Sequence, residues 1–359
     1  MAFKIIAYGV EPYEEHLYSE LNKYGFELTL VNDLLTADNG DLAKGHDGVL
    51  LFVNCLADRA NLEKFNDYGI NYVFTRTAGF NHIDLQAAAD LGIKVARVPA
   101  YSPNAIAELA VYLGTSLLRH TVYTTARTSK LNFTVTETNF SHEVHKIKVG
   151  IVGTGHIGCV EAELYKGLGA KLLGYDIFQS DFAKKLVEFK ELDELLAESD
   201  IVSLHLPYFP GKNENFVGED FIGKMKDGAI LINTARGELV DEAAVTKAIK
   251  SGKLEGFGAD VLTDEARFFG KDFSDGTEFP DATIKELIEL YPKVLITPHV
   301  AAMTDVAVSN MISTSYDNFN AAIKGESLGR AEVELPEPAK NELSDKEAAP
   351  QMAGLFFCK

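Results

Sequence analysis

The 359-residue sequence predicts an α/β protein with two doubly wound parallel-sheet domains. Two series of short apolar segments lead to this prediction, because enough chain separates the segments for a crossover helix between successive strands. The length agrees, since it is more than twice the roughly 150 residues typical of one domain. Hydrophobic residues make up 46% of the chain, which is sufficient for two cores.

The strand-like segments fall into two groups. The first group is FKIIAYGV (3–10), FELTLV (26–31), GVLLFV (48–53), INYVFTRT (70–77) and IKVARVP (93–99). The second group is KVGIVG (148–153), KLLGYD (171–176), DIVSLHLP (200–207), GAILINTA (228–235), GFGADV (256–261) and KVLITPH (293–299). Their nearly continuous apolar character is typical of parallel strands covered by helices on both faces.

A helix is predicted between the two groups, from Ser102 to His120, with Ser102 as a possible cap, Pro103 at the first helical position and apolar residues at spacings of three and four. A second helix is predicted over Asp305 to Ile323, where the chain would return to the first domain. The Pro- and Glu-rich residues 331–359 lack periodicity and predict a flexible, solvated tail. We therefore expect one domain from residues 1–101 plus 300–330, and a second from 102–299 inserted into it.

Composition excludes several function classes. The net charge of −19 disfavours a nucleic-acid partner, and no apolar run reaches the roughly 18 residues of a membrane helix. Three cysteines form neither a disulfide framework nor a zinc motif, which indicates a reducing, cytoplasmic location. The run His142-Glu143-Val144-His145 lacks the spacing of a zinc-binding HExxH helix, so we expect no metal site.

Gly153, Gly155 and Gly158 form a GxGxxG motif directly after a predicted strand and directly before a predicted helix. In that context the first glycine permits a tight turn, the second allows a pyrophosphate to approach the backbone, and the third allows close helix packing. Asp176 ends the next strand, where its carboxylate would accept hydrogen bonds from ribose hydroxyls. Ile177 follows without a nearby Arg, so the sequence predicts NAD rather than NADP as cofactor.

Three further residues stand at predicted strand ends: Arg236, Glu265 and His299. Reduction of a 2-oxo acid needs a fork-shaped cation for the carboxylate and a proton donor for the carbonyl, which Arg and His supply. A carboxylate such as Glu265 bonded to the second ring nitrogen would keep the imidazole charged and oriented. Their spacings of 29 and 34 residues do not establish proximity, and each residue alone has an ordinary structural explanation.

Residues 1–330 resemble the D-2-hydroxyacid dehydrogenase family. The resemblance rests on GTGHIG together with TRTAGFNHID, VPAYSPNAIAELA, KMKDGAILINTARGELVD, GADV and LITPH, in the order of that family. It implies a Rossmann NAD-binding domain inserted into a flavodoxin-like substrate domain. It also implies that Arg236 binds the substrate carboxylate and that His299, paired with Glu265, is the acid in reduction and the base in oxidation.

The resemblance implies further site residues. On the substrate side, backbone amides around Ala78 and Gly79 would hold the carboxylate, and Tyr101 would border the substrate. The expected cofactor contacts are the three glycines, His156, Ile157, Asp176, Ile177, His205, Pro207, Thr234, Ala235 and Asp260. The family also implies a homodimer formed through the cofactor domain, to which helix Ile106–Leu118 could contribute, although a role within the chain fits that helix equally well.

The substrate side chain is the open question. The chain most resembles the D-lactate, (R)-2-hydroxyglutarate and aromatic 2-hydroxyacid branch, but Phe52 stands where glutarate enzymes carry an Arg for the distal carboxylate. An apolar wall at Phe52 favours a broad or aromatic preference, although Phe52 could also simply pack in the core. The alternatives are a dehydrogenase specific for D-lactate or (R)-2-hydroxyglutarate, and a non-catalytic NAD-sensing regulator of the same fold.

Overall fold

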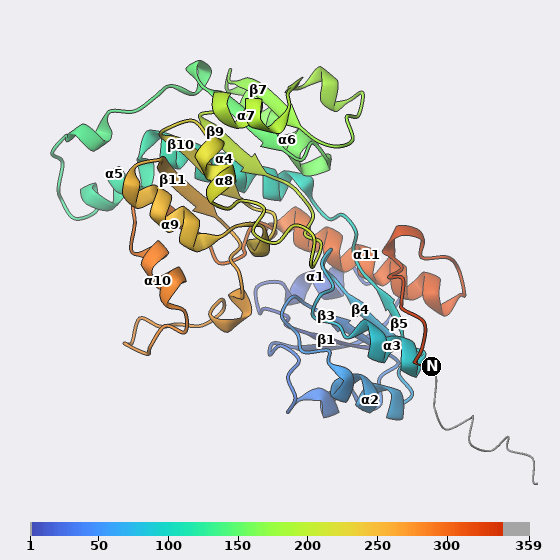
Figure 1. The fold of residues 1–359 in the computed structure, drawn as a ribbon. Helices are drawn as coiled ribbons and strands as arrows, with labels where there is room; N and C mark the ends of the chain where they lie inside the picture. Colours follow the sequence, from blue (N-terminus) through green and yellow to red (C-terminus); the bar gives the residue numbers. More distant parts are fainter. Residues whose placement is uncertain (1, 340–359) are drawn as a thin grey trace, which may run out of the picture. The chain divides into compact units, whose positions relative to one another are not determined.

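The computed structural model describes residues 2–339, which form two compact units. Unit 1 contains the chain up to Tyr101 and the segment that starts at Ser309, and unit 2 is Ser102–Val308. The chain returns to unit 1 at residue 309, whereas the sequence analysis expects the return at residue 300. Each unit is built on its own parallel sheet (Figure 1).

Unit 1 contains a five-stranded sheet with the order β2-β1-β3-β4-β5. Its strands are β1 (Lys4–Tyr8), β2 (Glu27–Val31), β3 (Gly48–Leu51), β4 (Tyr72–Thr75) and β5 (Lys94–Ala96). All four pairings are parallel, and the order is that of flavodoxin-like sheets, as expected. The helices are α1 (Glu15–Glu20), α2 (Arg59–Asp67), α3 (Leu85–Leu91) and most of α11 (Asp305–Ile323).

Two different cores cover the faces of this sheet. A mainly aliphatic core includes Leu62 and Phe65 of α2 and Ala88 of α3. An aromatic cluster forms around α11, where Phe319 stacks on Phe74 of β4 with ring centroids 4.4 Å apart. Helix α11 is therefore part of the core of unit 1, although it begins more than two hundred residues after β5.

Unit 2 contains a seven-stranded parallel sheet with the order β12-β11-β10-β9-β6-β7-β8. Its strands are β6 (Lys148–Val152), β7 (Lys171–Tyr175), β8 (Glu188–Phe189), β9 (Ile201–Leu204), β10 (Ala229–Asn233), β11 (Leu254–Ala259) and β12 (Val294–Ile296). The order reverses between β6 and β9, as in a Rossmann fold, and ligands of such sheets bind beyond the carboxyl ends of the strands at this reversal.

Helices cover both faces of the second sheet. They are α4 (Pro103–Arg119), α6 (His156–Gly167), α7 (Leu192–Glu198), α8 (Glu219–Lys224), α9 (Glu242–Ser251) and α10 (Ala282–Ile288). The short helix α5 (Thr121–Thr128) follows α4 and has no buried residue. One core joins α4 and α6 to the sheet, and the other contains side chains of α7 to α10.

Helix α4 confirms the predicted connecting helix. The Ser102 hydroxyl caps it by accepting a hydrogen bond from the Ala105 amide at 3.2 Å, and Pro103 is its first residue. Its apolar face, including Leu113 and Leu117, is buried against the sheet of unit 2. That face therefore has a role within the chain, whereas Tyr112 on the opposite side is exposed.

The segment from residue 331 to 339 differs from the predicted tail. Val333 is buried, and its amide donates to the carbonyl of Val95 at 3.1 Å, next to an antiparallel bridge between Ala96 and Glu332. The amide of Ala339 donates to Asp90. The expectation of a flexible tail is wrong for these residues, because the free edge of β5 offers them backbone partners; residues 340–359 lie outside the described residues.

Across residues 2–339, none of the helices combines the length and the apolar character needed to cross a lipid bilayer.

Candidate active site

The glycine-rich loop lies between β6 and α6. Gly153 has φ +99°, and a Cβ there would lie 2.7 Å from the carbonyl oxygen of His205, so both conformation and space require glycine. A Cβ at Gly158 would lie 2.1 Å from the carbonyl oxygen of Gly153, whereas one at Gly155 would meet nothing within 4 Å. The space beside Gly155, at the N-terminus of a 12-residue helix, therefore fits a dinucleotide pyrophosphate.

Asp176 directly follows β7 and is bonded to the same loop. Its carboxylate accepts hydrogen bonds from the amide of Thr154 at 2.7 Å and from the amide of Phe178 at 2.9 Å. The next two side chains, Ile177 and Phe178, are exposed. Asp176 therefore stands beside the glycine loop, and the two apolar residues that follow it offer no cation for a 2′-phosphate.

The ring of His205, which follows β9, is buried inside unit 2. Its side chain is only 2% exposed and bonds through Nε2 to the buried carboxylate of Glu161 on α6, with Ser203 Oγ 3.3 Å from the same nitrogen. Because this buried carboxylate draws the ring inward, His205 can line the cofactor site only with its backbone. The backbone of His205 packs against Gly153.

The remaining expected cofactor residues lie at the same edge of the sheet. His156 and Ile157 open helix α6, with His156 exposed, and Pro207 is exposed three residues after β9. Thr234 and Ala235 directly follow β10, and the buried Thr234 hydroxyl has no hydrogen-bond partner within residues 2–339. Five strand ends of unit 2 thus place expected site residues along one edge.

Arg236 is held on a rigid turn after β10. The Asn233 amide side chain donates to the carbonyl of Arg236 at 2.8 Å and accepts from the amide of Ala235 at 3.0 Å. A Cβ at Gly237 would lie 2.1 Å from the carbonyl carbon of Leu262, so this turn packs directly on the chain that leads to Glu265. The Arg236 side chain is partly exposed and donates to the carbonyl of Ala235.

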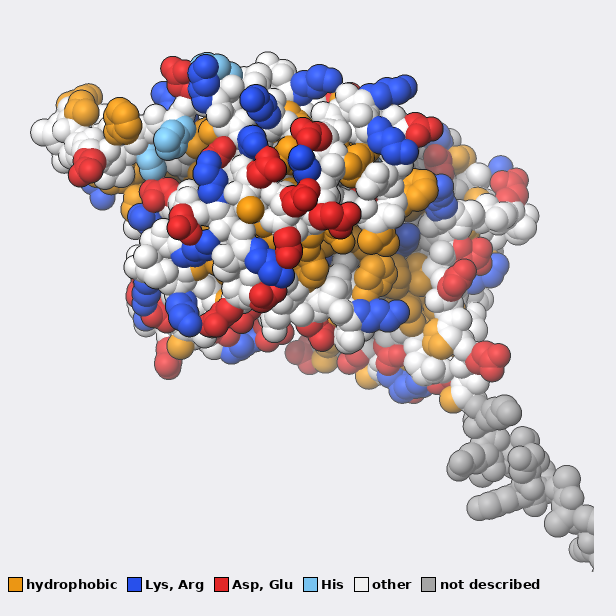
Figure 2. Space-filling view, turned by 45° about the horizontal axis from the view of Figure 1, so that its top comes forward, with side chains coloured by type: hydrophobic (Ala, Val, Ile, Leu, Met, Phe, Trp, Pro, Cys, Tyr) orange, Lys and Arg blue, Asp and Glu red, His pale blue; other side chains and the backbone are white. Residues whose placement is uncertain are grey.

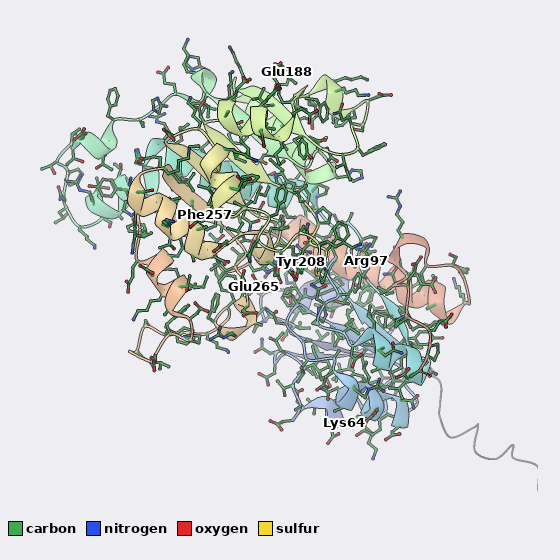
Figure 3. The ribbon with its side chains drawn as sticks, in the orientation of Figure 1. Lys64, Arg97, Glu188, Tyr208, Phe257 and Glu265 are labelled. Atoms are coloured by element: carbon green, nitrogen blue, oxygen red, sulfur yellow. The ribbon has the colours of Figure 1, made fainter. Side chains whose placement is uncertain are left out.

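Glu265 and His299 form an ion pair in which a carboxylate oxygen of Glu265 bonds His299 Nδ1. The second carboxylate oxygen accepts from the amide of Leu262 at 3.2 Å, which orients the acid. The His299 side chain remains 31% exposed, and its Nε2 has no hydrogen-bond partner among the described residues. Nε2 is therefore the nitrogen available to a ligand; Figure 3 labels Glu265 on the chain that follows β11.

The charges around His299 set its protonation. Burial alone lowers the pKa of His299, but the hydrogen bond and negative charge of Glu265 outweigh burial, so the pKa is raised above its ordinary value. Asp260 raises it further and Arg236 lowers it, which also shows that the guanidinium lies within electrostatic reach of the imidazole. The pair therefore favours the charged imidazolium over the neutral ring.

Hydrogen bonds to Asp260 hold the loop that contains His299. Its carboxylate is 1% exposed and accepts hydrogen bonds from the Thr297 hydroxyl at 2.6 Å and from the amides of Val300 and Ala301, each at 2.9 Å. His299 has φ +54°, a left-handed conformation that is costly for a side-chain-bearing residue. Burial raises the pKa of Asp260, and its hydrogen bonds oppose that rise. The Asp260 side chain thus holds the backbone of the loop that carries His299.

The expected substrate residues lie at the carboxyl edge of the unit 1 sheet. Phe52 directly follows β3, while Ala78 and Gly79 follow β4, whose last residue pairs with the last residue of β3. All three are partly exposed, as is Tyr101, whose carbonyl accepts from Asn310 at 2.7 Å. The sheet therefore brings Phe52 and the Ala78–Gly79 turn to neighbouring strand ends.

Hydrogen bonds hold the turn around Ala78. The Thr77 hydroxyl donates to the carbonyl of Gly79 at 2.7 Å, and Arg97 donates to the carbonyl of Ala78 at 3.0 Å. Arg97, which directly follows β5 and is labelled in Figure 3, also lies over the ring of Phe80. The guanidinium of Arg97 thus polarises the peptide group between Ala78 and Gly79, which makes the Gly79 amide a stronger hydrogen-bond donor.

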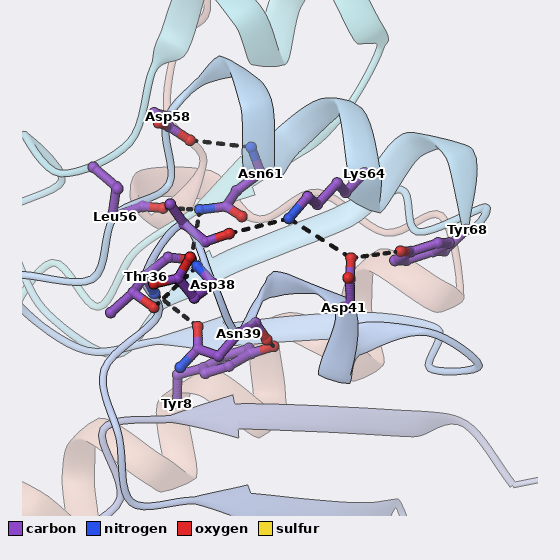
Figure 4. Close-up of polar contacts among 11 residues, drawn as sticks. Tyr8, Thr36, Asp38, Asn39, Asp41, Leu56, Asp58, Asn61, Lys64 and Tyr68 are labelled. Carbon is purple, nitrogen blue, oxygen red and sulfur yellow. Dashed lines mark hydrogen bonds and ion pairs between the residues drawn. The ribbon is translucent and has the colours of Figure 1, made fainter.

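A polar cluster around Asn61 and Lys64 anchors the loop that follows β2 (Figure 4). The buried Asn61 side chain of α2 donates to the carbonyls of Thr36 and Leu56, and Lys64 donates to the carbonyl of Ala37 at 3.1 Å. The amide of Leu56 also donates to the carbonyl of Leu35 at 2.8 Å. Helix α2 therefore fixes both the loop after β2 and the chain at Leu56, four residues after Phe52.

Sequence reasoning missed several residues that build this site. They are Asn233, which shapes the Arg236 turn; Glu161, which orients His205; Thr297, which bonds Asp260; Arg97; and the buried pair Glu14–Arg76. A charged residue inside an otherwise apolar strand segment, as in VFTRT, was the one available signal for such a buried pair.

The chain resembles proteins of known activity. A family model described as the NAD-binding domain of D-isomer-specific 2-hydroxyacid dehydrogenases matches residues 111–301. The chain is 40% identical over 317 residues to an aromatic 2-oxoacid reductase of Clostridium sporogenes (strain ATCC 15579), covering 88% of this chain and 95% of that protein. It is 36% identical over 325 residues to D-lactate dehydrogenase of Lactobacillus delbrueckii subsp. bulgaricus, covering 90% and 96%, respectively.

A similar fold occurs among solved structures. The pyruvate reductase of Chlamydomonas reinhardtii matches with a TM-score of 0.85 and 34% sequence identity, over 91% of this chain and 98% of that one.

Proposed function

This chain belongs to the D-2-hydroxyacid dehydrogenase family and is an NAD-dependent oxidoreductase, and we propose that it reduces 2-oxo acids with bulky apolar or aromatic side chains to (R)-2-hydroxy acids, reversibly. The observation that carries the proposal is the Glu265–His299 pair, which lies within electrostatic reach of Arg236. The pKa of His299 is raised, and its Nε2 has no hydrogen-bond partner within residues 2–339. A non-catalytic NAD sensor would need no proton donor of this kind.

Arg236, Glu265 and His299 divide the work. In reduction, His299 Nε2–H would give its proton to the carbonyl oxygen as it becomes an alkoxide, leaving a neutral imidazole; in oxidation the same nitrogen takes the proton back. Glu265 stabilises the imidazolium and fixes the ring by its bond to Nδ1. Arg236 would hold the substrate carboxylate with its guanidinium fork. NADH supplies the hydride to the carbonyl carbon.

The cofactor would lie along the carboxyl edge of the unit 2 sheet. Its pyrophosphate would rest at Gly153, Gly155 and Gly158 against the first turn of α6, where His156 and Ile157 begin the helix. Asp176 would accept hydrogen bonds from the ribose hydroxyls, beside Ile177. Pro207, Thr234 and Ala235 would line the rest of the site, with the His205 backbone and with Asp260 acting through the loop that carries His299.

The preference for a large side chain depends on Phe52. In unit 1, neighbouring strand ends carry Phe52 and the backbone amides of Ala78 and Gly79. The side chain of a 2-oxo acid would lie against Phe52, and its carboxylate would bind the two amides. Tyr101 would border the substrate. An aromatic ring offers no charge for a second carboxylate, which disfavours 2-oxoglutarate. The similarity to an aromatic 2-oxoacid reductase supports the same preference, and a D-lactate preference is the alternative.

The test is a substrate panel read by NADH absorbance. We expect kcat/KM for phenylpyruvate and 4-methyl-2-oxopentanoate to exceed that for pyruvate and 2-oxoglutarate. His299→Gln should lower kcat for every substrate by about two to four orders of magnitude, because it removes the proton donor, while NADH affinity measured by fluorescence stays near normal. A clear preference for 2-oxoglutarate would contradict the assignment of Phe52, and an unimpaired His299→Gln enzyme would contradict the assignment of the acid.

We also propose that the protein is a cytoplasmic homodimer. The free, buried thiols of Cys55 and Cys159 suit a reducing compartment. On unit 2, a segment after α5 exposes strongly apolar side chains: Leu131, Phe133, Val135 and Phe140. Figure 2 shows such side chains on the projection at the left of that view. Exposed apolar patches mark protein contacts, so light scattering should give twice the 39.3 kDa chain mass, and Phe133→Ser with Phe140→Ser should lower it.

A further inference from the structure

Arg76 is the largest fully buried side chain among the described residues. It follows β4 and is 1% exposed. Its two terminal nitrogens bond both carboxylate oxygens of Glu14, at 2.8 Å and 2.6 Å, and Nη2 also donates to the carbonyl of Gly9 at 2.9 Å. Glu14 is itself 1% exposed. The two residues thus form a bidentate ion pair inside unit 1.

Such a pair is a costly way to fill a core. Removing both charges from water costs several kcal/mol each, and apolar side chains of the same volume are often equally stable or more stable. Arg76 Nε is also buried without a hydrogen-bond partner within residues 2–339. The pair therefore calls for a role other than stabilising the fold.

The guanidinium lies over the ring of Phe52, with its central carbon 3.9 Å from the centroid of the ring. Cations attract the electron-rich face of an aromatic ring, and a guanidinium also stacks on that face as a plane. Gly9 packs beside the same residue, because a Cβ at Gly9 would lie 3.0 Å from the Phe52 Cβ. Arg76 therefore covers one face of the ring, and the partly exposed Phe52 keeps its remaining surface at the edge of the sheet.

We propose that the Glu14–Arg76 pair positions Phe52 and thereby sets the preference for aromatic 2-oxo acids. Glu14 holds the guanidinium in one plane, the guanidinium holds the ring parallel to it, and the ring presents a fixed flat surface to the substrate side chain. A preorganised flat wall favours planar side chains over small ones, because no ordering of the ring is needed on binding. The inference rests on the proposed function in that Phe52 must contact the substrate side chain.

The test compares kcat/KM for phenylpyruvate with kcat/KM for pyruvate in a double-mutant cycle. Glu14→Gln combined with Arg76→Met removes both charges together, so no unpaired charge stays buried. We expect this variant to lower the phenylpyruvate-to-pyruvate ratio by about 5- to 30-fold, the range of a buried cation–π contact, mainly through a higher KM for phenylpyruvate. In a Phe52→Leu background the same double change should leave the ratio within about twofold.

Arg76→Lys provides an intermediate case. It keeps a charge for Glu14 but loses the flat guanidinium, so the ratio should fall between those of the wild type and the double variant. The matched control is Phe319→Leu, which disturbs the core on the aromatic face of the same sheet without touching Phe52. It should lower the unfolding temperature and leave the ratio unchanged.

A second measurement does not depend on turnover. 4-Fluorophenylalanine at position 52 should give a fluorine resonance that shifts when Arg76 is replaced and does not shift in Phe319→Leu. The proposal is overturned if the folded double variant keeps the wild-type ratio, or if the ratio falls equally in the Phe52→Leu background. It is also overturned if the fluorine resonance does not shift when Arg76 is replaced. A wild-type preference for pyruvate would instead refute the proposed substrate class, while the cycle would still measure whether Arg76 acts through Phe52.

Discussion

The two glycines at the start of α6 should respond to alanine in opposite ways. Gly155 leaves open space at its Cβ position and has φ −73°, so Gly155→Ala should cost only the difference between glycine and alanine as helix caps, about 0.5–1 kcal/mol. In Gly158→Ala the new methyl group would lie 2.1 Å from the Gly153 carbonyl oxygen, an overpacking that costs about 3 kcal/mol. For a domain of this size, these energies lower the unfolding temperature by about 1–4 °C and 6–12 °C.

Cofactor binding should remove most of this difference in stability between the two variants. The methyl group of Gly155→Ala occupies the space that the pyrophosphate needs, so NADH affinity should fall by about 10- to 100-fold. At a concentration 100 times the dissociation constant, NADH stabilises the wild type by about 2.7 kcal/mol. A variant that binds 100-fold more weakly would gain only about 0.4 kcal/mol at the same concentration.

The assay combines thermal unfolding, with and without NADH, and a direct NADH fluorescence titration. Gly167→Ala is the control, since it lies on the last turn of the same helix, is exposed, and has an open Cβ position. It should stabilise the protein by about 0.5–1 kcal/mol and leave NADH affinity unchanged. Normal NADH affinity in a folded Gly155→Ala protein would refute the placement of the pyrophosphate.

Three further predictions concern the site and the fold. The charge of Glu265 raises the pKa of His299, so the rate of reduction should be maximal below that pKa and should decline as the pH rises through it. In Glu265→Gln the decline in kcat/KM should begin at lower pH. An unchanged pH profile would argue against the role of the pair. Arg236→Lys should lower kcat/KM by about 10- to 150-fold, because a point charge cannot replace the bidentate fork, and steady-state kinetics with near-wild-type values would contradict that role. Val333→Asp buries a carboxylate, so it should destabilise unit 1 by about 2–4 kcal/mol in denaturant unfolding. Glu334 is exposed, so the control Glu334→Lys should change stability by less than about 0.5 kcal/mol. Equal effects of the two changes would mean that this segment is not part of the folded unit.

The strands and long helices could be predicted because their signals are local. Continuous apolar runs identify strands buried on both faces, and Ser102 with Pro103 marks the start of α4 almost to the residue. The two-residue strand β8 was missed, since Glu188 and Phe189 at the edge of the sheet carry no apolar run. The return to unit 1 was placed nine residues early because nothing local in α11 distinguishes the two units.

The parts of the site that could not be predicted depend on contacts between distant residues. Glu265 and His299 are 34 residues apart, and only the neighbouring ends of β11 and β12 bring them together. His205 turns inward because of Glu161, 44 residues earlier, and Val333 is buried because β5 leaves an edge open. None of these partners is visible in a pattern of period two or 3.6.

Unit 1 is interrupted in the sequence, and this has a consequence for synthesis on the ribosome. Its first five strands emerge early, yet the aromatic face that includes Phe74 has no cover until α11 brings Phe319. Unit 2 is continuous and can fold while that face still waits for its partner. The unit that is synthesised first is thus completed last. Until α11 emerges, chaperones would act on the uncovered aromatic side chains of unit 1.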